Sequence, residues 1–86
     1  MTRQLVESSN VAEVGYDPET FRLEVKFKPN PAGHAAVWSY APVMRAEYDA
    51  MIHGASVGRV LALLKRNPGI TQKLVAEDRD GIETPL

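Results

Sequence analysis

The chain has 86 residues, of which 44% are hydrophobic, and a formal net charge of −1. This length allows one modest hydrophobic core and no second lobe, and the apolar fraction argues against global disorder. There is no cysteine, which excludes a disulfide framework and a thiolate metal site. We therefore expect one domain over residues 1–76 and an acidic C-terminal tail over residues 77–86.

The charge is unevenly distributed along the chain. Residues 1–19 and residues 77–86 each carry four acidic residues and one basic residue, whereas residues 20–76 carry eight basic and three acidic residues. A basic middle between acidic ends suits an anionic partner or pairing with the chain's own termini. Pairing within the chain is the simpler interpretation.

No segment resembles a targeting or membrane sequence. The first nine residues contain no continuous apolar stretch, and the longest apolar run, residues 60–64, is far too short to span a membrane. We therefore expect a soluble protein of the cytoplasm with no membrane partner.

The first two strands are predicted from alternation around a turn. Residues 11–16 read as a strand with Ala12, Val14 and Tyr16 on one face, and Asp17-Pro18 favours a turn. Residues 21–28 form the clearest pattern, because apolar and charged residues alternate with the period of a half-buried strand. The predicted apolar face consists of Phe21, Leu23, Val25 and Phe27.

A loop and a third strand follow. Pro29, Pro31 and Gly33 lie within five residues, which no sheet interior tolerates. This loop is longer than a tight hairpin, so its tip is expected to project from the sheet. Residues 35–40 then read as a strand with Ala36, Trp38 and Tyr40 on one face.

Two amphipathic helices are predicted next, over residues 43–53 and 56–66. Ser56 is a candidate N-cap for the second helix, and Asn67-Pro68-Gly69 ends it. Residues 70–75 are consistent with either a short edge strand or an extended segment. The apolar stripes are Met44, Tyr48, Met51, Ile52 and Ala55 in the first helix and Val57, Val60, Leu61 and Leu64 in the second.

These elements predict an α+β fold. A three-stranded antiparallel β-meander over residues 11–16, 21–28 and 35–40 is packed by the two C-terminal helices, and an extended tail follows. Three strands with one apolar face need a cover, which the helices supply.

Several residues recur in the order of a known family. They are Ser8-Ser9-Asn10, Gly15-Tyr16-Asp17, the alternating strand to Phe27, Trp38-Ser39-Tyr40, Val43, Tyr48 and Ala55-Ser56-x-Gly58. Over residues 6–70 the chain resembles the KTSC domain, which occurs at the C-terminus of some lysyl-tRNA synthetases and as stand-alone bacterial and phage proteins. The resemblance implies a small β-meander with C-terminal helices, no established activity and RNA binding as a suggested role. The chain departs from the family pattern at Trp38, at Pro42, which is displaced, and after Gly58.

Our leading hypothesis is a non-catalytic interaction module that binds a protein or joins a larger assembly. Its expected contact elements are the two termini and the loop residues Pro29, Asn30, Pro31 and His34, since prolines lower the entropy lost on docking. By analogy with phage members of the family, it would be a virion component or act in the host cytoplasm.

The alternative is an RNA-binding or single-stranded nucleic-acid-binding domain. Trp38 and Tyr40 are spaced to stack on bases, although the same spacing also suits core packing. The candidate phosphate contacts and stacking residues together are Lys26, Lys28, Trp38, Tyr40, Arg59, Lys65 and Arg66.

Catalysis and metal binding are not expected. His34 and His53, the only two histidines, lie far apart in the sequence, and no residue is placed to activate Ser8 or Ser9 as a nucleophile. We therefore predict no enzyme activity, no cofactor and no metal.

Overall fold

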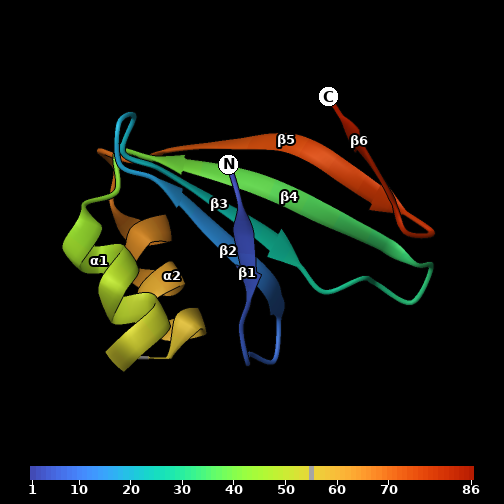
Figure 1. The fold of residues 1–86 in the computed structure, drawn as a ribbon, viewed down its shortest axis with the longest axis horizontal. Coiled ribbons are helices and arrows are strands. Elements are labelled where there is room, and N and C mark those ends of the chain that lie inside the picture. The colour runs from blue at the N-terminus through green and yellow to red at the C-terminus, as the bar shows by residue number, and fades with distance from the viewer. Residues whose placement is uncertain (55) are drawn as a thin grey trace.

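The computed structural model describes residues 1–54 and 56–86 and is built on one antiparallel sheet. Its six strands lie side by side in chain order, from β1 at one edge to β6 at the other (Figure 1). The strands are β1 (Arg3–Leu5), β2 (Val11–Asp17), β3 (Arg22–Phe27), β4 (His34–Ala41), β5 (Thr71–Arg79) and β6 (Ile82–Pro85). The two helices α1 (Arg45–Asp49) and α2 (Val57–Arg66) connect β4 to β5, with a π-helical segment, η1 (Ala50–Gly54), continuing α1.

The predicted fold class is therefore wrong. A three-stranded meander with two C-terminal helices was expected, but β1, β5 and β6 extend the sheet and the helices lie within the chain. The expected extended tail over residues 77–86 is instead the end of β5 followed by β6, which pair antiparallel. Residues 71–75 belong to β5, whose pairing with β4 is interrupted by a bulge between Val37 and Trp38 that breaks the period of two.

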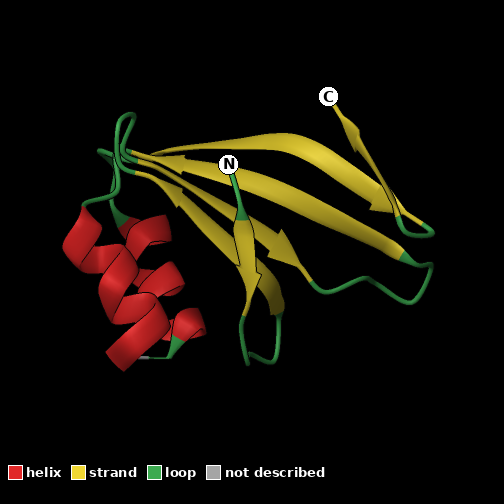
Figure 2. Cartoon of the chain, in the orientation of Figure 1, coloured by secondary structure: helices red, strands yellow, loops and turns green. Residues whose placement is uncertain are grey.

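The helices gather at one end of the sheet, and the paired strands β4 and β5 extend away from them (Figure 2). Ser56 caps α2 as predicted, because its hydroxyl accepts a hydrogen bond from the Arg59 N–H at 3.4 Å. At the other end of α2, the side-chain amide of Gln72 in β5 donates to the Lys65 backbone carbonyl at 3.4 Å. Ala55, which the predicted apolar stripe included, lies outside the described residues.

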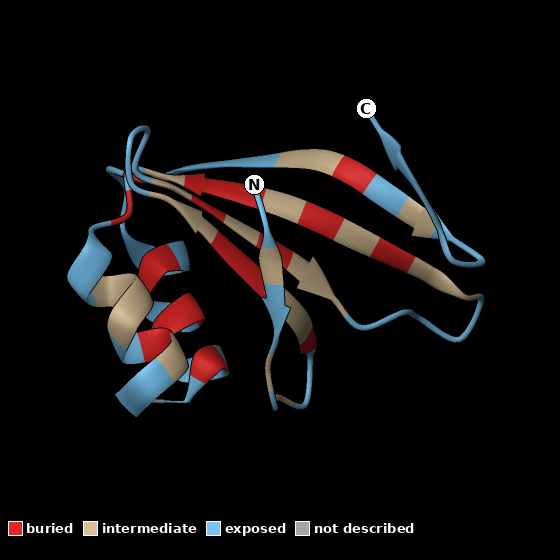
Figure 3. Ribbon diagram, in the orientation of Figure 1, coloured by how far each residue is buried: buried red, intermediate tan, exposed pale blue. Residues whose placement is uncertain are grey.

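The main core lies between the helices and one face of the sheet, where buried segments of strands and helices face each other (Figure 3). Leu23 and Val25 of β3 are fully buried there, as the alternating pattern predicted. Their partners across the interface and in the neighbouring strands are Val11, Val14, Tyr40, Val43, Met51, Val57, Val60, Leu61, Leu64 and Ile70. Burial of these apolar groups is the main force that holds the helices on the sheet.

Two residues expected in this core lie outside it. Phe21 was placed on the apolar face of β3, but it precedes the strand in a turn with φ of 55° and is 45% exposed. Met44 was placed in the first helical stripe, but it precedes α1 and is 47% exposed. Both residues lie before the first residue of their strand or helix. Their side chains therefore do not follow the period of that element and do not face the core.

A tyrosine pair joins β2 to the first helix. The rings of Tyr16 and Tyr48 stack with centroids 5.1 Å apart, and the Tyr16 hydroxyl donates to the Val43 carbonyl at 2.6 Å. The Val43 N–H in turn donates to the Phe21 carbonyl at 2.7 Å. Val43, which leads from β4 into α1, is therefore tied through its carbonyl to β2 and through its N–H to the β2–β3 turn.

We predict that Tyr16→Phe lowers the free energy of unfolding by about 1 kcal/mol, because it removes a hydrogen bond and leaves the carbonyl of the buried Val43 unpaired. Tyr48→Phe is the matched control, since the described part of the chain provides no hydrogen bond to its hydroxyl. Urea unfolding of the two variants measures the difference. Equal stability of both variants would show that the Tyr16 hydroxyl contributes nothing.

Candidate functional site

The face of the sheet that points away from the helices carries a cluster of charged side chains. Successive residues of a strand point to opposite faces, so the residues between the core positions of β2 and β3 lie on this second face. We name this group the ionic cluster; it consists of Arg3, Glu13, Glu24, Lys26, Asp78 and Glu83, which come from five different strands.

Arg3 is the centre of the ionic cluster. Its guanidinium donates to Glu24 at 2.6 Å, to Glu13 at 3.2 Å and to Glu83, while only 14% of its side chain is exposed. Burial alone would lower the pKa of Arg3, but the bonds to Glu83 and Glu13 and the charge of Glu24 outweigh it and raise the pKa. The guanidinium is thus held by carboxylates from three other strands.

The contact between Arg3 and Glu83 shows how the sheet is shaped. Arg3 lies in β1 and Glu83 in β6, at opposite edges of a six-stranded sheet. A flat sheet would hold these edges several strand spacings of about 4.8 Å apart. The sheet must therefore curl toward the face that carries the ionic cluster, which makes this face concave.

Gly15 provides the space for Arg3. It pairs with Arg3 across the β1–β2 ladder, and a Cβ atom at Gly15 would lie 2.7 Å from the Thr2 carbonyl oxygen and 2.9 Å from Arg3 Cγ. Any side chain at this position would push β1 away from β2 or displace the Arg3 stem. The backbone of β1 and the arginine side chain therefore both require glycine here.

Lys26 and Asp78 form the second part of the ionic cluster. The Lys26 ammonium donates to Asp78 at 2.6 Å and lies 3.6 Å from Glu83. The hydrogen bond with Lys26 is the main cause that lowers the pKa of Asp78, and the same bond raises the pKa of Lys26. Lys26 was predicted as a possible phosphate contact, but this carboxylate already occupies its ammonium group.

Small buried residues form the floor beneath these charges. Val37 is fully buried, and Ala35, Ser39 and Ala76 are also buried, although none of the four belongs to the core under the helices. They lie in β4 and β5 on the concave face. The curled sheet and its ionic cluster therefore cover a second, thin buried layer that the sequence analysis did not anticipate.

The predicted contact loop is internally ordered and exposed. Asn30 accepts hydrogen bonds at its side-chain oxygen from the N–H groups of Ala32 and His34, both at 3.0 Å, and its own N–H donates to the His34 carbonyl. Pro29, Asn30 and Pro31 are exposed, and His34 begins β4 half-buried. A depression of about 300 Å³ adjoins this loop and is lined by residues that include Pro29, Gly33, Lys26 and Asp78.

The predicted stacking residues lie on the core side of the sheet. Tyr40 is 1% exposed, and its burial raises its pKa to about 12. Trp38 lies opposite Val25 in the β3–β4 ladder and packs partly buried against the core. Neither ring is available as an open platform for a base.

The remaining predicted phosphate contacts are exposed but not gathered with the stacking residues. Lys28 follows β3, whereas Arg59, Lys65 and Arg66 lie on α2. The Lys65 ammonium lies 5.1 Å from the centre of the Phe27 ring, where it makes a cation–π contact.

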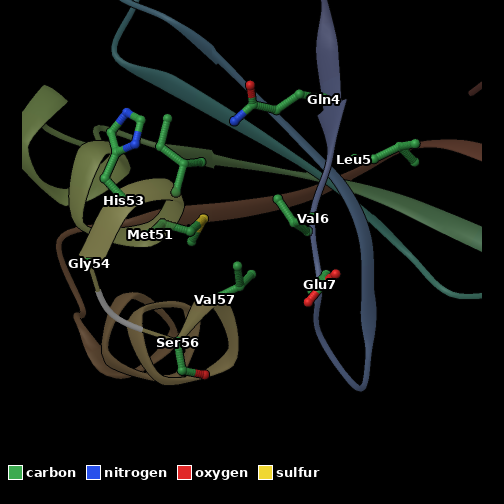
Figure 4. Close-up of a pocket in the computed structure, with 10 residues that line it drawn as sticks. Gln4, Leu5, Val6, Glu7, Met51, His53, Gly54, Ser56 and Val57 are labelled. Carbon is green, nitrogen blue, oxygen red and sulfur yellow. The ribbon is translucent and has the colours of Figure 1, made fainter.

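A groove between β1 and the helical segment is the largest hollow that we describe, with a volume of about 390 Å³ (Figure 4). Met51 and Val57 lie buried at its base and Val6 and Ile52 pack against the core, but most of the surface that the groove exposes is polar. Its remaining lining residues are Gln4, Leu5, Glu7, His53, Gly54 and Ser56. The sequence analysis did not anticipate this groove, since its two walls come from residues 4–7 and from residues 51–54 and 56–57.

Within the described ranges, residues 1–54 and 56–86, no group of three or more acidic, histidine or cysteine side chains is arranged to hold a metal ion. None of the helices described is long and apolar enough to cross a membrane.

The ion pair between Lys26 and Asp78 predicts a specific pH dependence of the free energy of unfolding. Because the folded-state pKa of Asp78 is lowered, its contribution to stability is present above the unfolded-state pKa of about 4 and is lost as the pH falls through the folded-state value. We expect Asp78→Asn to remove part of the fall in unfolding free energy between about pH 5 and pH 2. Urea unfolding across this range is the measurement.

Asp49→Asn is the matched control, because the Arg45–Asp49 pair is exposed and exposed pairs contribute little. Its pH profile should follow that of the unsubstituted protein. An Asp78→Asn profile with the same acid slope as the unsubstituted protein would contradict the role of this pair.

Comparisons with known proteins agree with the resemblance drawn from the sequence. The model of the KTSC domain family matches residues 7–62, which is more than half of the chain. A crystal structure of a KTSC domain protein from Yersinia pestis is similar in fold, with a TM-score of 0.69 and 23% sequence identity over 86% of this chain and 96% of that one. No curated protein matches the chain. The chain belongs to the KTSC domain family.

Proposed function

We propose that this KTSC domain is a non-catalytic module that binds another protein through the groove between β1 and the helices. The observation that carries the proposal is the composition of this groove. Its floor is formed by Met51, Val57 and Val6, and its rim carries the polar side chains of Gln4, Glu7 and His53. A hollow with a small apolar base and a larger polar rim suits a partner that inserts one apolar side chain and makes polar contacts around it.

The exposed loop of Pro29, Asn30, Pro31 and His34 is proposed as a second contact element. Its hydrogen bonds and its two prolines hold one conformation, so little entropy would be lost when it docks. It lies at the end of β3, away from the groove, and would extend the contact with a large partner.

The charged side chains of the concave face favour a structural role over catalysis. Arg3, Lys26 and Asp78 each bind an oppositely charged partner at short distance. A general acid or base needs free access to substrate, which these pairs restrict. Three further points are still predictions: that the protein has no enzyme activity, that it lies in the cytoplasm and that it belongs to a phage virion.

The second candidate function, RNA binding, has weaker support. Its proposed stacking residues, Trp38 and Tyr40, face the core, and its proposed phosphate contact Lys26 is paired with Asp78. The exposed cations of the predicted set, Lys28, Arg59, Lys65 and Arg66, favour it. These cations would give weak binding without sequence preference.

The proposal is tested by selecting short peptides from a displayed random library on the full chain and measuring their affinity by calorimetry. We expect Val6→Gln, on the groove floor, and Gln4→Arg, at its rim, to weaken the selected peptides about tenfold or more, because each disturbs the apolar contact. Leu63→Gln is the control, since Leu63 is 61% exposed on α2 and does not line the groove. Circular dichroism establishes that each variant is folded.

Two results would contradict the proposed function. One is a library that yields no peptide whose binding depends on the groove. The other is a filter-binding titration in which single-stranded RNA binds strongly with a steep dependence on salt, since that result would favour the nucleic-acid alternative.

A further inference from the structure

The outer edge of β1 presents backbone groups that β2 does not use. The Val6 N–H donates to the carbonyl of Ala12, the residue directly opposite it, so Val6 and Ala12 form a hydrogen-bonded pair. Such pairs alternate along an antiparallel ladder, which makes Leu5 opposite Glu13 a non-hydrogen-bonded pair. The N–H and C=O groups of Leu5 therefore point away from β2, toward the free edge of the sheet.

The groove adjoins this edge of β1. Gln4 and Leu5 point to opposite sides of β1, and both line the groove (Figure 4). Leu5 is 82% exposed, an unusual position for a leucine, and it lies directly beside its own free backbone groups. A chain that ran along this edge would contact the backbone of β1 and the apolar floor at the same time.

The opposite edge of the sheet, formed by β6, is less suited to pairing with another extended chain. Strand β6 contains Pro85, whose position opposite Ala76 faces the outer edge and which has no N–H to donate there. The loop before β6 is a tight turn closed by the Asp78 side chain, which accepts from the Gly81 N–H at 2.9 Å. Of the two sheet edges, β1 is the one that offers both a donor and an adjoining groove with an apolar base.

We propose that the partner segment is an extended strand that pairs with β1 as a seventh strand of the sheet. This inference rests on the proposed function, because it names the form of the segment that occupies the groove. Neighbouring strands lie about 4.8 Å apart, so the added strand would place alternate side chains on the helix side of β1, over Val6, Met51 and Val57. The partner segment therefore carries apolar residues at every second position.

The test uses the tightest-binding peptide from the selection on the full chain. Amide hydrogen exchange, followed by NMR, reports on the edge directly: exchange of the Leu5 amide should slow at least about tenfold on binding, because a new hydrogen bond covers it. The Gln4 amide, which faces β2, should change little. N-methylation of the peptide one residue at a time should weaken binding about tenfold at every second position, where the peptide N–H faces β1.

Two variants separate the backbone donor from the side chain. Leu5→Pro removes the outward N–H and should weaken the peptide about tenfold, whereas Leu5→Ala keeps this N–H and should weaken it less. An edge position whose N–H faces solvent tolerates proline, so Leu5→Pro is expected to fold. Should it not fold, hydrogen exchange and the N-methylated peptides still decide the question.

The outcomes distinguish this inference from the proposed function. A peptide that binds in the groove without protecting the Leu5 amide, or whose N-methylated forms show no alternation, would overturn strand addition and leave groove binding intact. Light scattering that shows a dimer of the protein alone, with the Leu5 amide already protected, would assign the edge to a second copy and overturn the inference. Failure to select any groove-dependent peptide would instead contradict the proposed function.

Discussion

The shape of this domain depends on one arginine that binds carboxylates from three other strands. Arg3 in β1 contacts Glu13 in β2, Glu24 in β3 and Glu83 in β6, so it connects both edges of the sheet across the concave face. Removing a guanidinium from water is costly unless its hydrogen bonds are satisfied, and here several carboxylate oxygens satisfy them. The absence of a side chain at Gly15 lets the arginine stem lie against β2. The curl of the sheet, the position of β6 and the buried floor of small residues all follow from this arrangement.

The two faces of the sheet are held by different kinds of interaction. On the helix side, apolar residues of the strands pack against Met51, Leu61 and Leu64 of the helical segment. On the concave side, ion pairs cover a floor of Val37 and other small residues. Apolar packing on one side and ionic contacts on the other leave the edge of β1 and its groove as the open part of the fold. This arrangement supports the proposed protein-binding role, because the open edge lies next to a groove with an apolar base.

Part of the fold could be predicted because its signals are local. The alternation of residues 21–28 predicted the burial of Leu23 and Val25, and the apolar spacing with Ser56 as cap predicted the helix that the structure shows as α2. The order of short motifs along the chain predicted the KTSC family, and the family model confirms it. For the strand and the helix, the pattern and the structure that it produces lie within a few neighbouring residues.

The rest could not be predicted because it depends on residues that are distant in the sequence. Strand β1 has three residues and β6 four exposed ones, too few for a period to be recognised. Glu83 gains its role from Lys26 and from Arg3, which is eighty positions away in the chain. Pairing between the basic middle and the acidic ends was the simpler interpretation of the charges, and Lys26 does pair with Asp78, but the sequence does not show that β5 and β6 bring these charges over the concave face. The groove could not be predicted for the same reason, since residues 4–7 meet residues 51–54 and 56–57 only after the sheet and helices have packed.

The most direct test of the central claim is amide hydrogen exchange in Arg3→Met, compared with Arg45→Met, which removes an exposed arginine from a pair with Asp49. The account predicts that loss of Arg3 frees β6, so that exchange of the Leu86 amide and of the other β6 amides accelerates while the amides of β3 stay protected. The Arg45→Met variant should exchange like the unsubstituted protein. If β6 exchanges at the same rate in both variants, Arg3 does not hold the two edges of the sheet together, and the account of the curled sheet is wrong.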